Sequence, residues 1–144
     1  MARVQADSKI IDELNDLINQ NIDVSLFPYK KGNSIRIGSF AIRKKKSQYI
    51  VINCKENKIV EQCFSQPAAI AIAKRMSKGD EGRTNDIMLL DQQLQKNFVD
   101  CIFYSHTIEN TKDLLKREAT FDRYDIAKYR VEDATAALEC HIFR

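Results

Sequence analysis

The stretch from Arg83 to Arg144 is sixty-two residues long and contains neither glycine nor proline. These two residue types are the strongest helix breakers, and Gly79 and Gly82 lie just before the stretch. We therefore predict that the C-terminal part of the chain forms a long helical arm. Residues 1–79 are predicted to form a small α+β domain, and residues 84–144 the arm.

Apolar residues recur along the arm at steps of three, four or seven, the spacing that places side chains on one helix face. This stripe comprises Ile87, Leu90, Leu94, Phe98, Cys101, Ser105, Ile108, Leu115 and Ala119. Charged residues such as Asp86, Asp91 and Lys96 are expected to lie off the stripe and to be solvated. A second stripe, out of register with the first, comprises Phe121, Tyr124, Val131, Leu138 and Ile142.

The change of register is explained by a bend, a hairpin or a second partner face. Residues 105–111, around His106, have low helix propensity, and Asn110 is a candidate cap for a new helix with Asp113 three positions on. The alternative is one unbroken helix of about fifty-five residues, roughly 80 Å long. Because helices gain most of their stability from packing, the arm must fold back on itself or pair with another chain in a coiled-coil-like manner.

The first half of the chain is predicted to begin with a loosely held segment, residues 1–6, followed by a helix capped at Asp7 or Ser8. This helix is expected to end near residues 19–21, and a short strand is expected at residues 22–26.

A three-stranded antiparallel meander is predicted within residues 34–64, with a β-bulge at Gly38 where the apolar pattern changes face. Together with the strand at residues 22–26, this gives a small sheet of three to four strands. A helix capped by Ser65, with Pro67 in its first turn, follows the meander. We expect this helix and the N-terminal helix to cover the sheet.

Enzyme signatures are missing from the sequence. The four glycines do not form a phosphate-binding loop, and HExxH, GxSxG and EF-hand patterns are absent. The cysteines, which are expected to be reduced, are too widely spaced for a zinc site, and neither histidine is expected to bind a metal. We therefore predict no catalytic residue, no metal and no cofactor. No apolar run is long enough to cross a membrane, and no signal peptide is recognised, so an intracellular, soluble protein is expected.

Positive charge is concentrated in the first half of the chain. Residues 1–83 contain fifteen Lys and Arg against nine Asp and Glu, whereas residues 84–144 contain eight against eleven. The candidate nucleic-acid-binding residues are Lys30, Lys31, Arg36, Arg43, Lys44, Lys45 and Lys46. Tyr29, Phe40 and Tyr49 are candidate stacking surfaces for bases. The alternative, which we favour, is that Phe40 and Tyr49 belong to the core and that the lysines keep an edge turn soluble.

Three segments carry a resemblance to a known group of proteins: Ile35 to Gly38, Gln66 to Lys74, and Phe103 to Asp113. Together they resemble small proteins of tailed marine bacteriophages, some of which are presumed virion components. The resemblance implies a structural role in the host cytoplasm or the virion and assigns no functional residue.

The sequence thus predicts an α+β protein with an N-terminal helix, a small antiparallel sheet, a covering helix and a helical arm. We expect a non-enzymatic assembly protein that forms a homo-oligomer or contacts other virion proteins through its arm. A nucleic-acid-binding accessory protein is the alternative.

Overall fold

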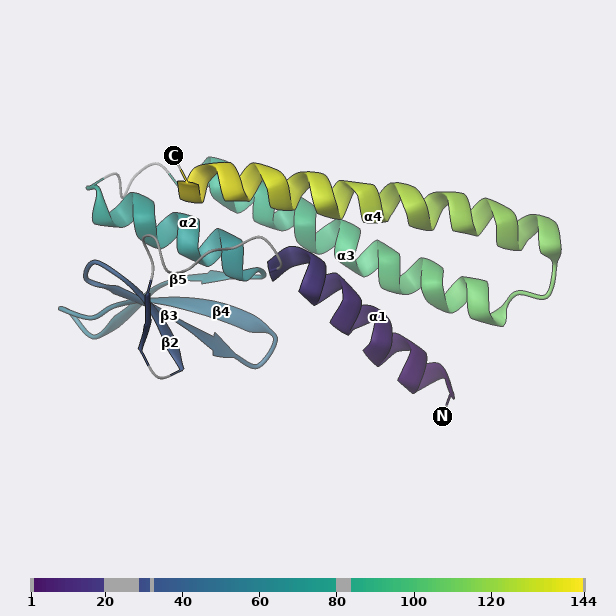
Figure 1. Ribbon diagram of the computed structural model, residues 1–144, viewed down its shortest axis with the longest axis horizontal. Coiled ribbons are helices and arrows are strands. Elements are labelled where there is room, and N and C mark those ends of the chain that lie inside the picture. The colour runs from purple at the N-terminus through teal and green to yellow at the C-terminus, as the bar shows by residue number, and fades with distance from the viewer. Residues whose placement is uncertain (1, 20–28, 32, 80–83, 144) are drawn as a thin grey trace.

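The computed structural model describes residues 2–19, 29–31, 33–79 and 84–143. Its elements are α1 (Ala2–Asn19), β1 (Tyr29–Lys31), β2 (Ser34–Ile37), β3 (Phe40–Lys45), β4 (Gln48–Asn53), β5 (Lys58–Cys63), α2 (Gln66–Ser77), α3 (Asn85–Asn110) and α4 (Leu114–Phe143). The N-terminal helix, antiparallel sheet, covering helix and C-terminal helical arm confirm the predicted α+β class (Figure 1).

The sheet has five strands in the order β1-β2-β3-β4-β5, and every neighbouring pair is antiparallel. This is one strand more than the upper end of the predicted range. A strand at residues 29–31 was not expected, and residues 34–45 form two strands instead of one. The predicted strand at residues 22–26 lies outside the described residues.

The predicted bulge at Gly38 is wrong, because Gly38 and Ser39 form the turn of a β2–β3 hairpin. Gly38 has φ +54°, as favoured at the first central position of a two-residue hairpin turn. In this hairpin Ile37 pairs with Phe40, and Ile35 pairs with Ile42. Cross-strand partners lie on the same face of a sheet, so all four side chains point to one side. The apparent change of face in the sequence was therefore the change of strand direction.

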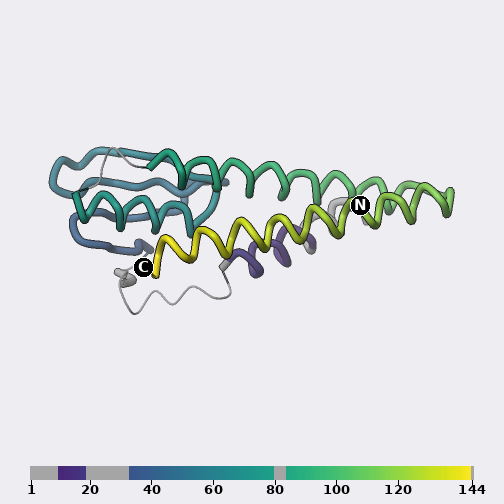
Figure 2. Tube along the Cα trace, turned by 90° about the horizontal axis from the view of Figure 1, so that it is seen from above, coloured from purple at the N-terminus to yellow at the C-terminus, as the bar shows by residue number. Residues whose placement is uncertain are grey.

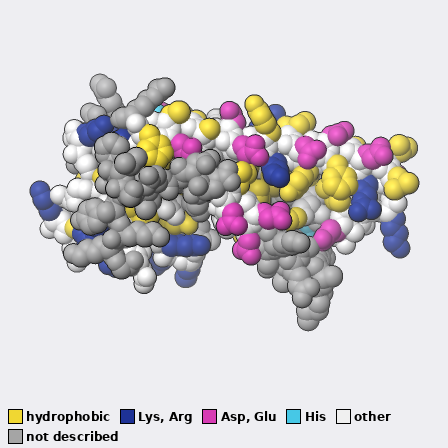
Figure 3. All heavy atoms as spheres, in the orientation of Figure 1, with side chains coloured by type: hydrophobic (Ala, Val, Ile, Leu, Met, Phe, Trp, Pro, Cys, Tyr) yellow, Lys and Arg dark blue, Asp and Glu magenta, His cyan; other side chains and the backbone are white. Residues whose placement is uncertain are grey.

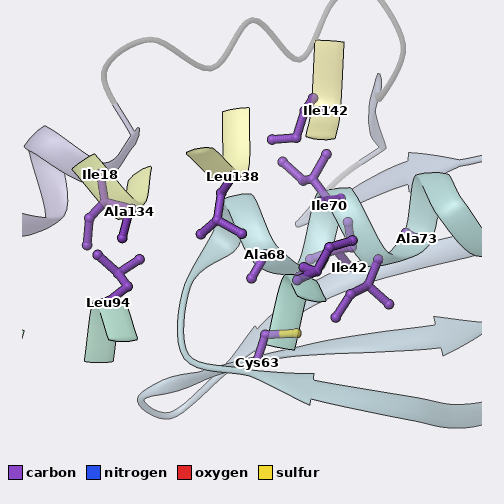
Figure 4. Close-up of a cluster of buried hydrophobic side chains, with 14 of the residues drawn as sticks. Ile18, Ile42, Cys63, Ala68, Ile70, Ala73, Leu94, Ala134, Leu138 and Ile142 are labelled. Carbon is purple, nitrogen blue, oxygen red and sulfur yellow. The ribbon is translucent and has the colours of Figure 1, made fainter. Parts of the chain in front are cut away.

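Helix α2 lies between the sheet and the C-terminal end of α4. All residues from Pro67 to Lys74 are buried, so this part of the helix has no solvent-facing side, as expected for a helix that is apolar all round. The close-up of the core shows Leu138 and Ile142 of α4 on one side of α2 and Cys63 of β5 on the other (Figure 4). As predicted, Ser65 caps the helix, and its hydroxyl accepts a hydrogen bond from the Ala68 amide.

Helix α1 begins at Ala2, so the predicted cap at Asp7 or Ser8 is wrong. The helix packs mainly against α3, and also against α2 and α4, with Leu14 and Ile18 buried. Its apolar face is thus covered by the other helices, and the expectation that it covers the sheet is wrong.

The arm is a hairpin of α3 and α4, which run side by side and extend well beyond the sheet (Figures 1 and 2). Its turn, residues 111–113, lies a few residues beyond His106. Asp113 caps α4, because its carboxylate accepts hydrogen bonds from the amides of Leu115 and Lys116. Asn110, the predicted cap, instead donates from its side chain to the carbonyl of His106 in α3.

A continuous hydrophobic core joins the arm to the rest of the molecule. It contains residues of α1, the sheet, α2, α3 and α4, among them Leu14, Val51, Ile72, Leu94 and Leu138. The base of the arm therefore shares one core with α1, the sheet and α2, while its distal half extends away from the sheet.

Candidate functional site

The predicted apolar stripe of α3 lies inside the hairpin. Five of its residues are buried, namely Ile87, Leu94, Phe98, Cys101 and Ile108, and Leu90 is partly buried. Ser105 is buried as well. These side chains are covered within the chain, so the stripe completes the fold and is not free to bind a partner.

The predicted continuation of the stripe into α4 is wrong. Leu115 is 78% exposed, and Ala119 is exposed as well. In the second predicted stripe, Val131, Leu138 and Ile142 are buried, but Phe121 is 44% exposed. The reason is the turn at residues 111–113, which ends the α3 face and starts α4 with a new orientation.

The beginning of α4 has no buried side chain over two turns. Residues 112–119 are all exposed, and Thr120 is the first buried residue of the helix. Leu114 and Leu115 expose 72% and 78% of their surface. A helical segment that carries two leucines without covering them is unusual, because packing supplies most of the stability of a helix.

Further large apolar side chains are exposed on the same half of the arm. We call this set the distal apolar surface, and it comprises Val99, Phe103, Leu114, Leu115, Phe121, Ile126 and Tyr129. Figure 3 shows hydrophobic side chains on the arm interspersed with acidic and basic ones. Residues 109–123, which include the turn of the hairpin, contain four acidic and four basic residues, so this region carries no net charge.

One carboxylate that was expected to be solvated is buried and organises the centre of the fold. Asp91 is only 3% exposed. Its Oδ2 accepts a hydrogen bond from the Phe64 amide at 2.7 Å, and its Oδ1 accepts from the Ser65 amide at 3.0 Å and the Ser65 hydroxyl at 2.7 Å. Burial raises the pKa of Asp91, and these hydrogen bonds oppose the shift. The spacing contained a signal, since Asp91 lies four residues after Ile87 and three before Leu94, on the buried stripe.

A polar cluster ties the end of α2 to the base of the arm. Arg75 donates to the Asp86 carboxylate at 2.5 Å, and its guanidinium lies 3.0 Å from Nδ1 of His141. Burial acts to raise the pKa of Asp86, but hydrogen bonds from Arg75 and the Ile87 amide, with the charges of Arg75 and His141, outweigh it and lower the pKa. Lys74, which is buried, donates to the carbonyl of Ile142. The cluster is a structural connection between three helix ends.

The predicted basic residues do not form one surface. Lys44 lies on the face of the sheet that packs against α2, as does its cross-strand partner Tyr49, while Arg36 and Arg43 alternate to the opposite face. Arg36 donates to the thiol of Cys54, and Arg43 donates to the hydroxyl of Ser34. Lys45 and Lys46 are exposed at the β3–β4 turn, and the side chains of Tyr29, Lys30 and Lys31 lie outside the described part of the structure.

The candidate stacking residues divide in the same way. Phe40 is buried in the core, as the alternative interpretation expected, and Tyr49 is half-buried with the Lys44 ammonium 5.9 Å from its ring centroid.

The four cysteines are free thiols, and no group of three or more His, Cys, Asp or Glu within the described ranges is arranged to hold a metal ion.

Comparisons with protein-family models, curated proteins and solved structures found no match to this chain. None of the helices in the described ranges is both long and apolar enough to cross a membrane. The resemblance to phage proteins therefore stays a prediction.

Proposed function

We propose that this protein is a non-enzymatic assembly protein that forms a homo-oligomer through the distal apolar surface of its arm. The observation that supports this proposal is the exposure of the beginning of α4. Residues 112–119 are all exposed, and Leu114 and Leu115 expose most of their surface. The α3 part of the predicted apolar stripe has no role in the proposal, because its side chains are already covered within one chain. Leu115, which was predicted to continue the stripe, is exposed and belongs to the distal apolar surface.

The physical argument concerns what these side chains gain when they are covered. Burying a leucine side chain completely is worth about 1.5–3 kcal/mol. The distal apolar surface carries seven large apolar side chains that a partner could cover. Covering them would also support the first turns of α4, which now lack packing.

A second copy of the chain is the partner that fits this region best. In a two-fold symmetric contact the same surface appears on both sides, so a strongly charged surface would repel its copy. Residues 109–123 carry four acidic and four basic residues and are therefore suited to self-association. The resemblance noted above extends the proposal to a phage particle, in which the arm would contact other virion proteins.

Sedimentation analysis of two matched variants tests this proposal. Leu114→Glu combined with Leu115→Glu adds two negative charges to the distal apolar surface. Gln92→Glu combined with Gln95→Glu adds the same charge at two exposed positions nearer the base of α3. The unmodified protein and the variant changed at Gln92 and Gln95 are expected to sediment as an oligomer. The variant changed at Leu114 and Leu115 is expected to sediment as the 16.6 kDa monomer. An unmodified protein that stays monomeric at the highest concentration reached would contradict the proposal.

A nucleic-acid-binding accessory role is the second candidate, supported by the exposure of Lys44, Lys45 and Lys46 next to one another at the end of the β3–β4 hairpin. Changing all three lysines to alanine is expected to weaken binding of a single-stranded probe and to reduce the salt dependence of that binding, because fewer counterions are released. The absence of binding to any single- or double-stranded probe at low salt would exclude this role.

A further inference from the structure

A cavity of about 310 Å³ lies at the end of the sheet where α2 begins. Two neighbouring cross-strand pairs contribute to it, Ile35 with Ile42 and Lys44 with Tyr49. Gln66, the first residue of α2, and Asn33, the residue before β2, also line it. The lining residues within the described part of the chain are Asn33, Ser34, Ile35, Ile42, Lys44, Tyr49 and Gln66.

The lining combines groups that suit a flat, negatively charged ligand. Among the described lining residues Lys44 supplies a positive charge, and there is no carboxylate that would repel an anion. Tyr49 supplies an aromatic ring for stacking, while Asn33 and Gln66 supply amide groups that both donate and accept hydrogen bonds. Ile35 and Ile42 are buried and give an apolar wall. Ligand sites typically show this mixture of apolar walls and a few polar groups.

The position of Lys44 fits a role in holding a phosphate. Its side chain is exposed, and its ammonium lies 5.9 Å from the Tyr49 ring centroid, near the limit of a cation–π contact. A flexible, exposed lysine can therefore leave the ring when a base stacks there. Lys45 and Lys46 follow directly on the same hairpin, but neither lines the cavity.

We propose that this cavity binds a nucleoside monophosphate unit, either as a free nucleotide or as part of a single-stranded nucleic acid. The base stacks on Tyr49, its edge meets the amides of Asn33 and Gln66, and Lys44 binds the phosphate. The volume is at the low end for ligand sites, which fits one nucleotide better than a dinucleotide. Binding here does not depend on assembly through the arm, and it gives the second candidate function a defined site.

Two neighbouring lysines provide the matched test. Lys44 and Lys45 are both exposed, but successive side chains on a strand point to opposite faces, so only Lys44 lines the cavity. Calorimetry with adenosine and uridine 5′-monophosphate is expected to show binding that Lys44→Met weakens about tenfold, equivalent to about 1.4 kcal/mol, and that Lys45→Met leaves nearly unchanged. Equal effects of the two substitutions would overturn the proposal, because they would indicate general electrostatic attraction.

The aromatic ring is tested by a second pair of variants. Tyr49→Phe keeps the ring and is expected to retain binding, whereas Tyr49→Leu removes it and is expected to weaken binding about fivefold or more. Thermal melts of both variants separate loss of stacking from loss of the fold. Retention of full affinity by a folded Tyr49→Leu variant would contradict the proposed site.

The source of the nucleotide is decided by comparing uridine monophosphate, inorganic phosphate and a short oligodeoxythymidine. Tighter, Lys44-dependent binding of the oligonucleotide indicates a single strand, and equal binding indicates a free nucleotide. Binding of phosphate as strong as that of the nucleotides would contradict a role for the ring and the amides. If only the oligonucleotide binds, and Lys44→Met has no effect, the cavity proposal fails while the second candidate function stands.

Discussion

Removing the carboxylate of Asp91 should be among the most destabilising single changes in this protein. The side chain is 3% exposed and accepts hydrogen bonds from two backbone amides and one hydroxyl, all at the start of α2. It thereby ties α3 to the junction between β5 and α2. The N-cap of α2 also depends on Asp91, because the Ser65 hydroxyl that donates to Asp91 is the same hydroxyl that caps α2.

The magnitude follows from the number and type of these bonds. A hydrogen bond to a charged group contributes about 1.5–3 kcal/mol, and each buried donor left without a partner costs about 1–3 kcal/mol. The three bonds share one carboxylate and are not additive, so we expect Asp91→Ala to lower the free energy of unfolding by about 3–5 kcal/mol. Asp91→Asn keeps one oxygen for Ser65 but turns an NH₂ group toward the Phe64 amide, and a loss of about 1–3 kcal/mol is expected.

Urea denaturation at low protein concentration measures both losses, since dilution limits any contribution from association. Glu109→Ala, an exposed carboxylate on the same helix, is the control and should change the free energy of unfolding by less than about 0.5 kcal/mol. A loss below about 1 kcal/mol for Asp91→Ala would refute the argument, because it would mean that the three donors find other partners at little cost.

Two further predictions concern the turns and the polar cluster. Gly38→Ala should lower the free energy of unfolding by about 1–3 kcal/mol, because φ is +54° and a Cβ atom would lie 2.9 Å from the hydroxyl of Ser77. Gly79→Ala, at φ +85° with open space around it, should lower it by only about 1 kcal/mol. Equal losses for the two variants in thermal melts would contradict the steric argument. The pKa of Asp86 is lower in the folded state than in the unfolded state. The Asp86 carboxylate therefore stabilises the fold fully above its unfolded-state pKa of about 3.9, and this stabilisation is lost as the pH falls through its folded-state pKa. Asp86→Asn should therefore destabilise the protein at pH 7 but much less at pH 3 in urea titrations, and a pH-independent difference would count against this assignment.

The sequence predicted those parts of the fold that depend on local signals. Ser65 and Pro67 marked the start of α2 correctly, because capping and the restricted φ of proline act within one turn. The hairpin in the arm was one of two stated alternatives, and low helix propensity near the turn favoured it. Gly38 was misinterpreted, because an apolar pattern that changes phase at a glycine fits both a bulge and a tight turn.

The candidate site was harder to predict, because periodicity identifies the apolar face of a helix but not what covers it. Ile87 and Leu94 lie on a real apolar face, yet this chain covers that face itself. Asp91 lies on the same face and was misplaced because its charge suggested solvent, whereas its hydrogen-bond partners are about 26 residues away in the sequence. The exposure of Leu115 could not be predicted either, since it depends on how α4 is oriented after the turn.

Hydrogen exchange at the tip of the arm tests the central claim most directly. In a single chain the amides of residues 114–121 belong to a helical segment with little packing, so they should exchange rapidly. If a second copy covers the distal apolar surface, their exchange should slow as the protein concentration rises, while exchange in α2 stays constant. Rapid exchange of residues 114–121 at every concentration would contradict assembly through the arm.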